Sequence, residues 1–158
     1  MKVTHPDAER DRIVRFLDAL RAAEAAAVRV LAAWISVCRF DGLRGGLRAI
    51  AEREAAHAEL LEERLREMGE PCSATLDEVV FDMALARFGS GSIPDEEKLA
   101  LVLARYPDDA SAARPIRATL EQLDHDLETR EILRLVAEGE AATVAWLRAY
   151  HAGLARDA

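Results

Sequence analysis

The sequence has little of what folds rich in tight turns or disulfides require. Of its 158 residues, eight are glycine, five are proline and two are cysteine, and aromatic residues make up 5%. Such scarcity of turn-forming residues argues against many short strands joined by tight turns. Cys38 and Cys72 form no Cys-x-x-Cys motif, so we expect neither a disulfide framework nor a zinc–cysteine site. No apolar run approaches the ~20 residues that a bilayer-spanning helix needs.

Basic residues are outnumbered by acidic ones. The chain has 29 acidic and 21 basic residues, which gives a net charge of -8. A phosphate backbone would be repelled over most of such a surface, so we expect no nucleic-acid partner. The first residues, MKVTHPDAERDR, contain no apolar signal segment, and we therefore expect a cytoplasmic protein without a membrane partner.

What the sequence does have is the composition of helices: alanine, leucine, glutamate and arginine dominate it. The length suits a single domain, residues 1–158, with one core. Apolar residues three or four positions apart predict long helices over 7–39, 43–68 and 127–154. Shorter helices are predicted over 76–88, 95–105 and 115–124. Gly69 is expected to end the second helix, and Asp126 is expected to cap the last one.

These elements predict an all-α fold. Two long helices joined by a short turn must pack antiparallel. A second pair, reached by a long and partly helical crossover between the second and third bundle helices, completes a four-helix bundle.

Polar residues interrupt the apolar stripes of the three long helices at their middles. Glu24 interrupts the first stripe, Glu54 and His57 the second, and Glu140 and Thr143 the last. Residues three apart share one helical face, so Glu54 and His57 should both point to the core. Counted from the first turn, Glu24 and Glu54 differ in height by roughly 6 Å, which helix tilt can absorb. Arg53, like most charges of this helix, falls off the stripe.

A lone ionised carboxylate in an apolar core costs several kcal/mol unless it is paired or binds a metal. Carboxylate oxygens with an imidazole nitrogen suit iron, manganese or zinc. The sequence therefore predicts Glu24, Glu54, His57 and Glu140 as metal ligands. Two alternatives stay open: residues at stripe edges that reach water, and a metal-free buried hydrogen-bonded network that sets helix register.

At this point the chain resembles the ferritin-like superfamily, which includes bacterioferritin, rubrerythrin and the di-iron hydroxylases. The resemblance lies in Glu24, in the Glu54-x-x-His57 (ExxH) motif with its helix ending Met68-Gly-Glu-Pro, and in the last helix from 126 to 147. It implies a ferritin-like four-helix bundle, an iron site and oxidoreductase chemistry. It covers about two thirds of the chain, and the middle third does not match.

The chain departs from the family pattern at two ligands. Thr143 stands where the family has its second Glu-x-x-His histidine, and the short third helix has Arg114, Arg117 and Ala118 where a glutamate is expected. Three carboxylates and one histidine match one divalent ion better than two. An asymmetric site could instead be completed by one of three further residues: Asp124, His125 or Glu78.

Two functions follow from these residues. The first is a ferritin-like metal-binding protein with iron-dependent oxidation chemistry. The second is a metal-free helical scaffold or protein-interaction domain that has kept the bundle and lost the chemistry. Small residues add two expectations: Gly139 can admit a neighbouring helix or ligand, and the run from Glu24 to Val28 can pack tightly in the bundle or in a homodimer.

Overall fold

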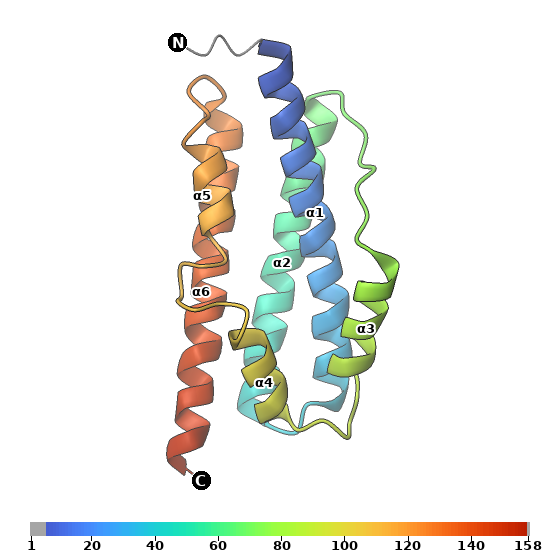
Figure 1. Ribbon diagram of the computed structural model, residues 1–158, viewed down its shortest axis with the longest axis vertical. Coiled ribbons are helices and arrows are strands. Elements are labelled where there is room, and N and C mark those ends of the chain that lie inside the picture. The colour runs from blue at the N-terminus through green and yellow to red at the C-terminus, as the bar shows by residue number, and fades with distance from the viewer. Residues whose placement is uncertain (1–5, 158) are drawn as a thin grey trace.

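The computed structural model describes residues 6–157, and within this range it contains helices and no strand (Figure 1). The helices are α1 (Pro6–Val37), α2 (Asp41–Glu67), α3 (Glu78–Phe88), α4 (Asp95–Leu103), α5 (Arg114–Leu120) and α6 (Leu127–Asp157). The all-α prediction is confirmed. Residues 1–5 and 158, which the single-domain prediction includes, lie outside the described part. The predictions about the N-terminal segment, as far as they fall on residues 1–5, also lie outside it. Over the described residues, no helix combines the length and apolarity that crossing a membrane requires.

The two long helices α1 and α2 pack antiparallel along most of their lengths, as predicted. The turn between them lies two residues earlier than the sequence indicated, because α1 ends at Val37 and α2 begins at Asp41. Asp41 lies in the first turn, where a negative charge stabilises the positive end of the helix dipole. Gly69 ends α2 as predicted. Its φ is +76°, and the amide of Glu70 donates to the Leu65 carbonyl at 2.9 Å.

Buried polar contacts fix how the later helices sit on this pair. Asp126 caps α6 as predicted by accepting from the Thr129 amide at 3.0 Å, and it also accepts from Arg64 near the end of α2. Asp95, buried at the start of α4, accepts from the Trp34 indole and from the Arg39 amide, each at 2.8 Å. Thus α6 starts beside the end of α2, and α4 starts beside the end of α1.

The crossover between α2 and α4 runs back along α1 on its outer side (Figure 1). Asp18 of α1 holds its first part by accepting from the amides of Ser73 and Ala74 at 2.8 and 2.7 Å. Its second part is α3, which has no fully buried residue. Within the crossover, α3 is the one helix, and it begins at Glu78, two residues later than the helix predicted over 76–88.

Two short helices, α4 and α5, together form the third side of the bundle. Both were predicted, over 95–105 and 115–124, but the first was expected within the crossover. In the structure α4 instead lies along α6, in line with α5 (Figure 1). Pro107 lies four residues beyond Leu103, the last residue of α4, and Asp108 accepts from the Ala110 amide at 3.0 Å in a local turn. Proline and this side-chain turn both break a helix, which explains the interruption.

The core is accordingly divided into two apolar clusters. One contains Ile116 of α5, with residues of α1, α2 and α6. The other contains Leu99 and Leu103 of α4 together with Trp34 and residues of α2 and α6. The third side of the bundle is thus formed by α4 at one end and α5 at the other, with a non-helical segment between them.

Candidate metal centre

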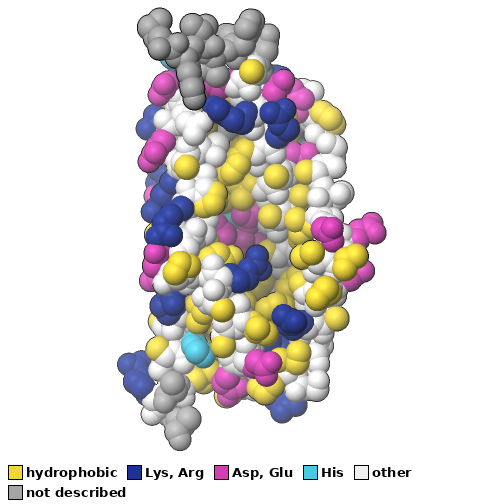
Figure 2. Space-filling view, viewed as in Figure 1, with side chains coloured by type: hydrophobic (Ala, Val, Ile, Leu, Met, Phe, Trp, Pro, Cys, Tyr) yellow, Lys and Arg dark blue, Asp and Glu magenta, His cyan; other side chains and the backbone are white. Residues whose placement is uncertain are grey.

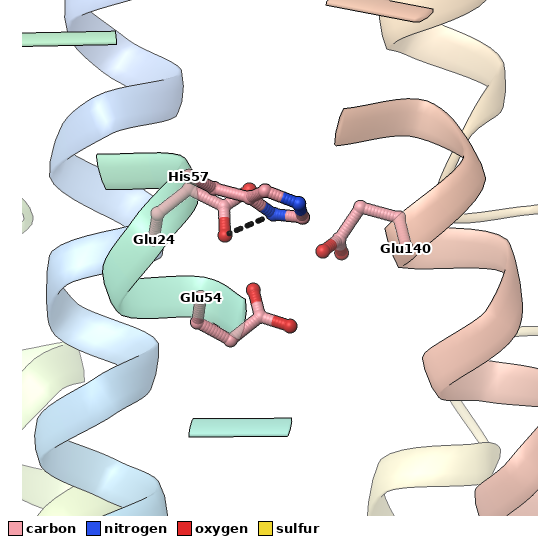
Figure 3. A group of neighbouring side chains, drawn as sticks. All are labelled: Glu24, Glu54, His57 and Glu140. Atoms are coloured by element: carbon pink, nitrogen blue, oxygen red, sulfur yellow. Dashed lines mark ion pairs between the residues drawn. The ribbon is translucent and has the colours of Figure 1, made fainter. Parts of the chain in front are cut away.

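Four side chains from three long helices converge in the interior (Figure 3). Glu24 comes from α1, Glu54 and His57 from α2, and Glu140 from α6. Each offers one ligand atom, and these four atoms all lie within 4.8 Å of one another. The convergence predicted from the interrupted stripes is therefore present. This geometry could hold a metal ion.

The group is well shielded from water. Glu24, Glu54 and His57 are only 3, 4 and 6% exposed, and Glu140 is half-buried. Glu24, Glu54 and His57 do not lie at a wet stripe edge, so that alternative is wrong for these three residues. The cause is helical geometry: Glu54 and His57, three residues apart, present their side chains to the same interface with α1 and α6.

Gly139 gives the histidine its space. It is buried in α6, and a Cβ placed on it would lie 2.5 Å from His57 Cε1 and 3.0 Å from His57 Nε2. Carbon atoms do not approach that closely without displacement. The expectation that Gly139 admits a close neighbour is thus confirmed, and the neighbour is the imidazole ring.

Several polar atoms at the centre have no hydrogen-bond partner in the structure. They are Glu24 Oε2, His57 Nδ1 and Glu140 Oε1. His57 Nδ1 lies 3.5 Å from Glu24 Oε2, an ion-pair distance without hydrogen-bond geometry. Buried polar atoms are nearly always satisfied, so three such atoms facing one another call for a further partner.

Burial also changes the acidity of these groups. Loss of solvent raises the pKa of Glu24 to about 7. Burial is the main cause that raises the pKa of Glu54 to about 8, and the neighbouring Glu24 adds to it. Burial is also the main cause that raises the pKa of Glu140 to about 8, with a further contribution from the charge of Glu54. Burial lowers the pKa of His57. Without a cation the site therefore favours neutral groups, because three adjacent carboxylates repel one another.

Thr143 and Arg53 occupy the side of the centre where the ferritin-like pattern has a second histidine. Arg53 Nη2 donates to Thr143 Oγ1, which in turn donates to Glu54 Oε1 at 3.5 Å. Although the helical position of Arg53 was predicted off the stripe, its side chain is half-buried against Thr143, and its Nε has no partner among the described residues. A long arginine side chain can bend toward a neighbouring helix, which helical position alone does not reveal.

The three residues suggested as additional ligands are not part of this group. Glu78 is exposed in the first turn of α3, and Asp124 and His125 are exposed between α5 and α6. The short α5 and the following turn leave Asp124 and His125 at the surface near one end of the molecule. The suggestion that one of them completes the site is wrong for this structure.

Comparisons of this chain with known protein families, with curated proteins and with solved structures found no match. The case for a function therefore rests on the arrangement of the residues described above. That arrangement is an all-helical chain with a buried cluster of three carboxylates and one histidine.

Proposed function

We propose that this chain is a ferritin-like metal-binding protein in which Glu24, Glu54, His57 and Glu140 hold one divalent transition-metal ion. Iron is the proposed ion, with manganese and zinc as alternatives. The observation that carries the proposal is the convergence of four ligand atoms within 4.8 Å, three of these side chains having a buried polar atom without a partner. Carboxylate oxygen and imidazole nitrogen are the donors these metals take in proteins.

Charge supports one ion rather than two. Three ionised glutamates carry three negative charges, and the Arg53 guanidinium next to them carries one positive charge. A single divalent ion then makes the buried group neutral. A second divalent ion would leave two uncompensated positive charges in the interior, which is unfavourable.

The order of the helices supports the ferritin-like assignment. Because the crossover returns along α1, the segment formed by α4 and α5 runs in the same direction as α2, and α6 runs opposite to it. A bundle with one long crossover is the connection of ferritin-like folds. The chain departs from a ferritin-like bundle at its third side, where α4 and α5 replace one long helix.

Within the site, each residue has a distinct task. Glu24, Glu54 and Glu140 supply the negative charge that attracts the cation, and His57 supplies a neutral nitrogen that Gly139 lets into place. Thr143 and Arg53 orient the Glu54 carboxylate. Iron held there would supply redox chemistry to the site, and on this basis we propose an oxidoreductase.

One observation favours the second candidate, a metal-free helical scaffold or protein-interaction domain. The pKa values of the three glutamates are raised to about 7 or about 8, so protonated carboxyl groups can share the interior near neutral pH. Protonated carboxyls can donate hydrogen bonds and so satisfy one another. A homodimer and a cytoplasmic location also stay predictions.

Metal counting separates the two candidates. Purified protein is supplied with ferrous iron under anaerobic conditions, and with manganese and zinc separately, and bound metal is counted by plasma mass spectrometry. We expect close to one ion per chain, lost in Glu54→Gln and His57→Ala. Glu59→Gln, an exposed site on the same helix, and His125→Ala are the matched controls and should bind like the parent.

Binding of no ion by the folded parent protein would leave the scaffold as the better account. Binding of two ions would contradict the charge argument. Equal loss of metal in Glu59→Gln and Glu54→Gln would show that the centre is not the binding site.

A further inference from the structure

A cavity of about 440 Å³ opens beside the centre, lined by residues of α1, α2, α3, α4 and α6. Figure 2 shows this hollow in the surface, with acidic side chains visible deep inside it and hydrophobic side chains around it. Its volume lies within the range of small-molecule sites, and a dry apolar cavity of about 150 Å³ already holds a benzene molecule.

The floor of the cavity is the carboxylate side of the centre. Glu24, Glu54 and Glu140 line it together with Thr143, whereas His57 does not. The histidine lies on the other side, against Gly139. A molecule in the cavity would therefore meet the ligand carboxylates directly, without passing the imidazole.

The walls are apolar. They include Leu31 and Trp34 from α1, Phe81 and Phe88 from α3, and Val102 from α4. Burial raises the pKa of Tyr106, the remaining hydroxyl of the lining, so it stays a neutral phenol. Among the described residues that line the cavity, Arg105 is the one basic side chain, and it is exposed.

Helix α3 contributes Phe88 to the edge of the core and otherwise faces the cavity and solvent. It buries no residue completely, yet four of its side chains line the cavity: Val80, Phe81, Ala84 and Phe88. Arg29 of α1 lies 4.6 Å from the centre of the Phe81 ring and holds that side of the wall. A helix with this pattern adds little to the packing of the bundle, and its apolar side chains enclose a space next to the carboxylates.

We propose that this cavity binds an uncharged, predominantly apolar small molecule of about two rings in size, and that this is the substrate class of the neighbouring centre. The binding itself stands on the cavity, and the role as substrate rests on the proposed metal-binding function. Carboxylates at the floor disfavour an anion, and the apolar side chains that make up most of the lining leave a charged group few hydrogen-bond partners. When the glutamates hold a metal ion, its positive charge also disfavours an organic cation in the cavity.

Three naphthalene derivatives of matched size test this assignment: the neutral hydroxymethyl, the anionic carboxylate and the cationic aminomethyl compound. Binding is followed on metal-free and on zinc-loaded protein by nitrogen-15 NMR of the Trp34 indole N–H. Trp34 lines the cavity, and the residue is 2% exposed. We expect saturable binding of the neutral compound to both forms. The carboxylate should bind at least about tenfold more weakly to both, and the aminomethyl compound likewise to the zinc-loaded form.

A filled cavity provides the matched variant. Ala84→Trp places a large side chain in the cavity, whereas Ala86→Trp, on the exposed face of the same helix, does not. Ala84→Trp should abolish binding of the neutral compound and leave the metal count unchanged, and Ala86→Trp should change neither. Contacts between ligand protons and the rings of Trp34, Phe81 and Phe88, measured by nuclear Overhauser effects, locate the ligand without any substitution.

The outcomes are distinguishable from those for the metal. No saturable binding of the neutral compound, or stronger binding of the carboxylate, would overturn the cavity assignment even if one ion is bound. Preference of the zinc-loaded protein for the aminomethyl compound would overturn it too. Binding of the neutral compound to a protein that takes up no metal would keep the ligand site and refute the proposed function.

Discussion

Replacing Gly139 with alanine gives the sharpest test of the geometry at the centre. Alanine is favoured over glycine inside a helix by about 1 kcal/mol, so helix propensity alone predicts a more stable protein. The added Cβ, however, would lie 2.5 Å from His57 Cε1 and 3.3 Å from Arg53 Cδ. Relief requires that the imidazole rotate or that α6 move away from α2.

The two effects can be weighed against each other. Overpacking of a filled interior costs about 1–3 kcal/mol. Set against the gain in propensity, the net change should lie between none and a loss of about 2 kcal/mol. Under the proposed function, displacing His57 should weaken zinc binding by at least about tenfold, because disturbing the groups around a metal costs about 10–100-fold in affinity.

A second glycine offers the matched control. Gly45 lies exposed within α2, and a Cβ placed there meets nothing within 4 Å. Gly45→Ala should therefore stabilise the protein by up to about 1 kcal/mol and leave zinc affinity unchanged. Urea unfolding monitored by circular dichroism gives the stabilities, and titration of zinc against a competing chelator gives the affinities. If Gly139→Ala matches Gly45→Ala in both measurements, the close approach of His57 to α6 is refuted.

Three further predictions concern protons, the ligand set and the helix cap. The glutamates of the centre have pKa values of about 7 or about 8 when folded, against 4.5 as the ordinary value. Since the folded chain then binds more protons than the unfolded one, the urea midpoint of metal-free protein should fall as pH rises from about 4.5 to about 8, and a rise would contradict this. The lowered pKa of His57 opposes the trend only below its ordinary value of 6.5. Thr143→His adds a ligand but no charge, so the metal count should stay near one ion per chain, and two ions would refute the charge argument. Asp126→Ala removes the cap of α6 and the partner of Arg64, and should lower the free energy of unfolding by about 1–2 kcal/mol, whereas removal of the exposed neighbour Asp124 should change it little.

The sequence by itself determined the helices and the members of the centre. Periodicity located the three long helices to within a few residues, and local chemistry placed their ends, as with Gly69 after α2 and Asp126 before α6. The four converging residues were found because a charged residue in the middle of an apolar stripe must face the core. These are properties of one helix at a time, and a helix repeats regularly enough for them to be read from spacing.

Only the tertiary structure decided what surrounds the centre. The packing of α4 and α5 along α6, the contact of Arg53 with Thr143 and the cavity walled by α3 all join segments distant in the chain. Arg53 and Thr143 are 90 residues apart, and no local pattern relates them. The physical reason is that spacing along a helix fixes the face on which a residue lies, whereas the approach of that face to another depends on how all the helices pack together.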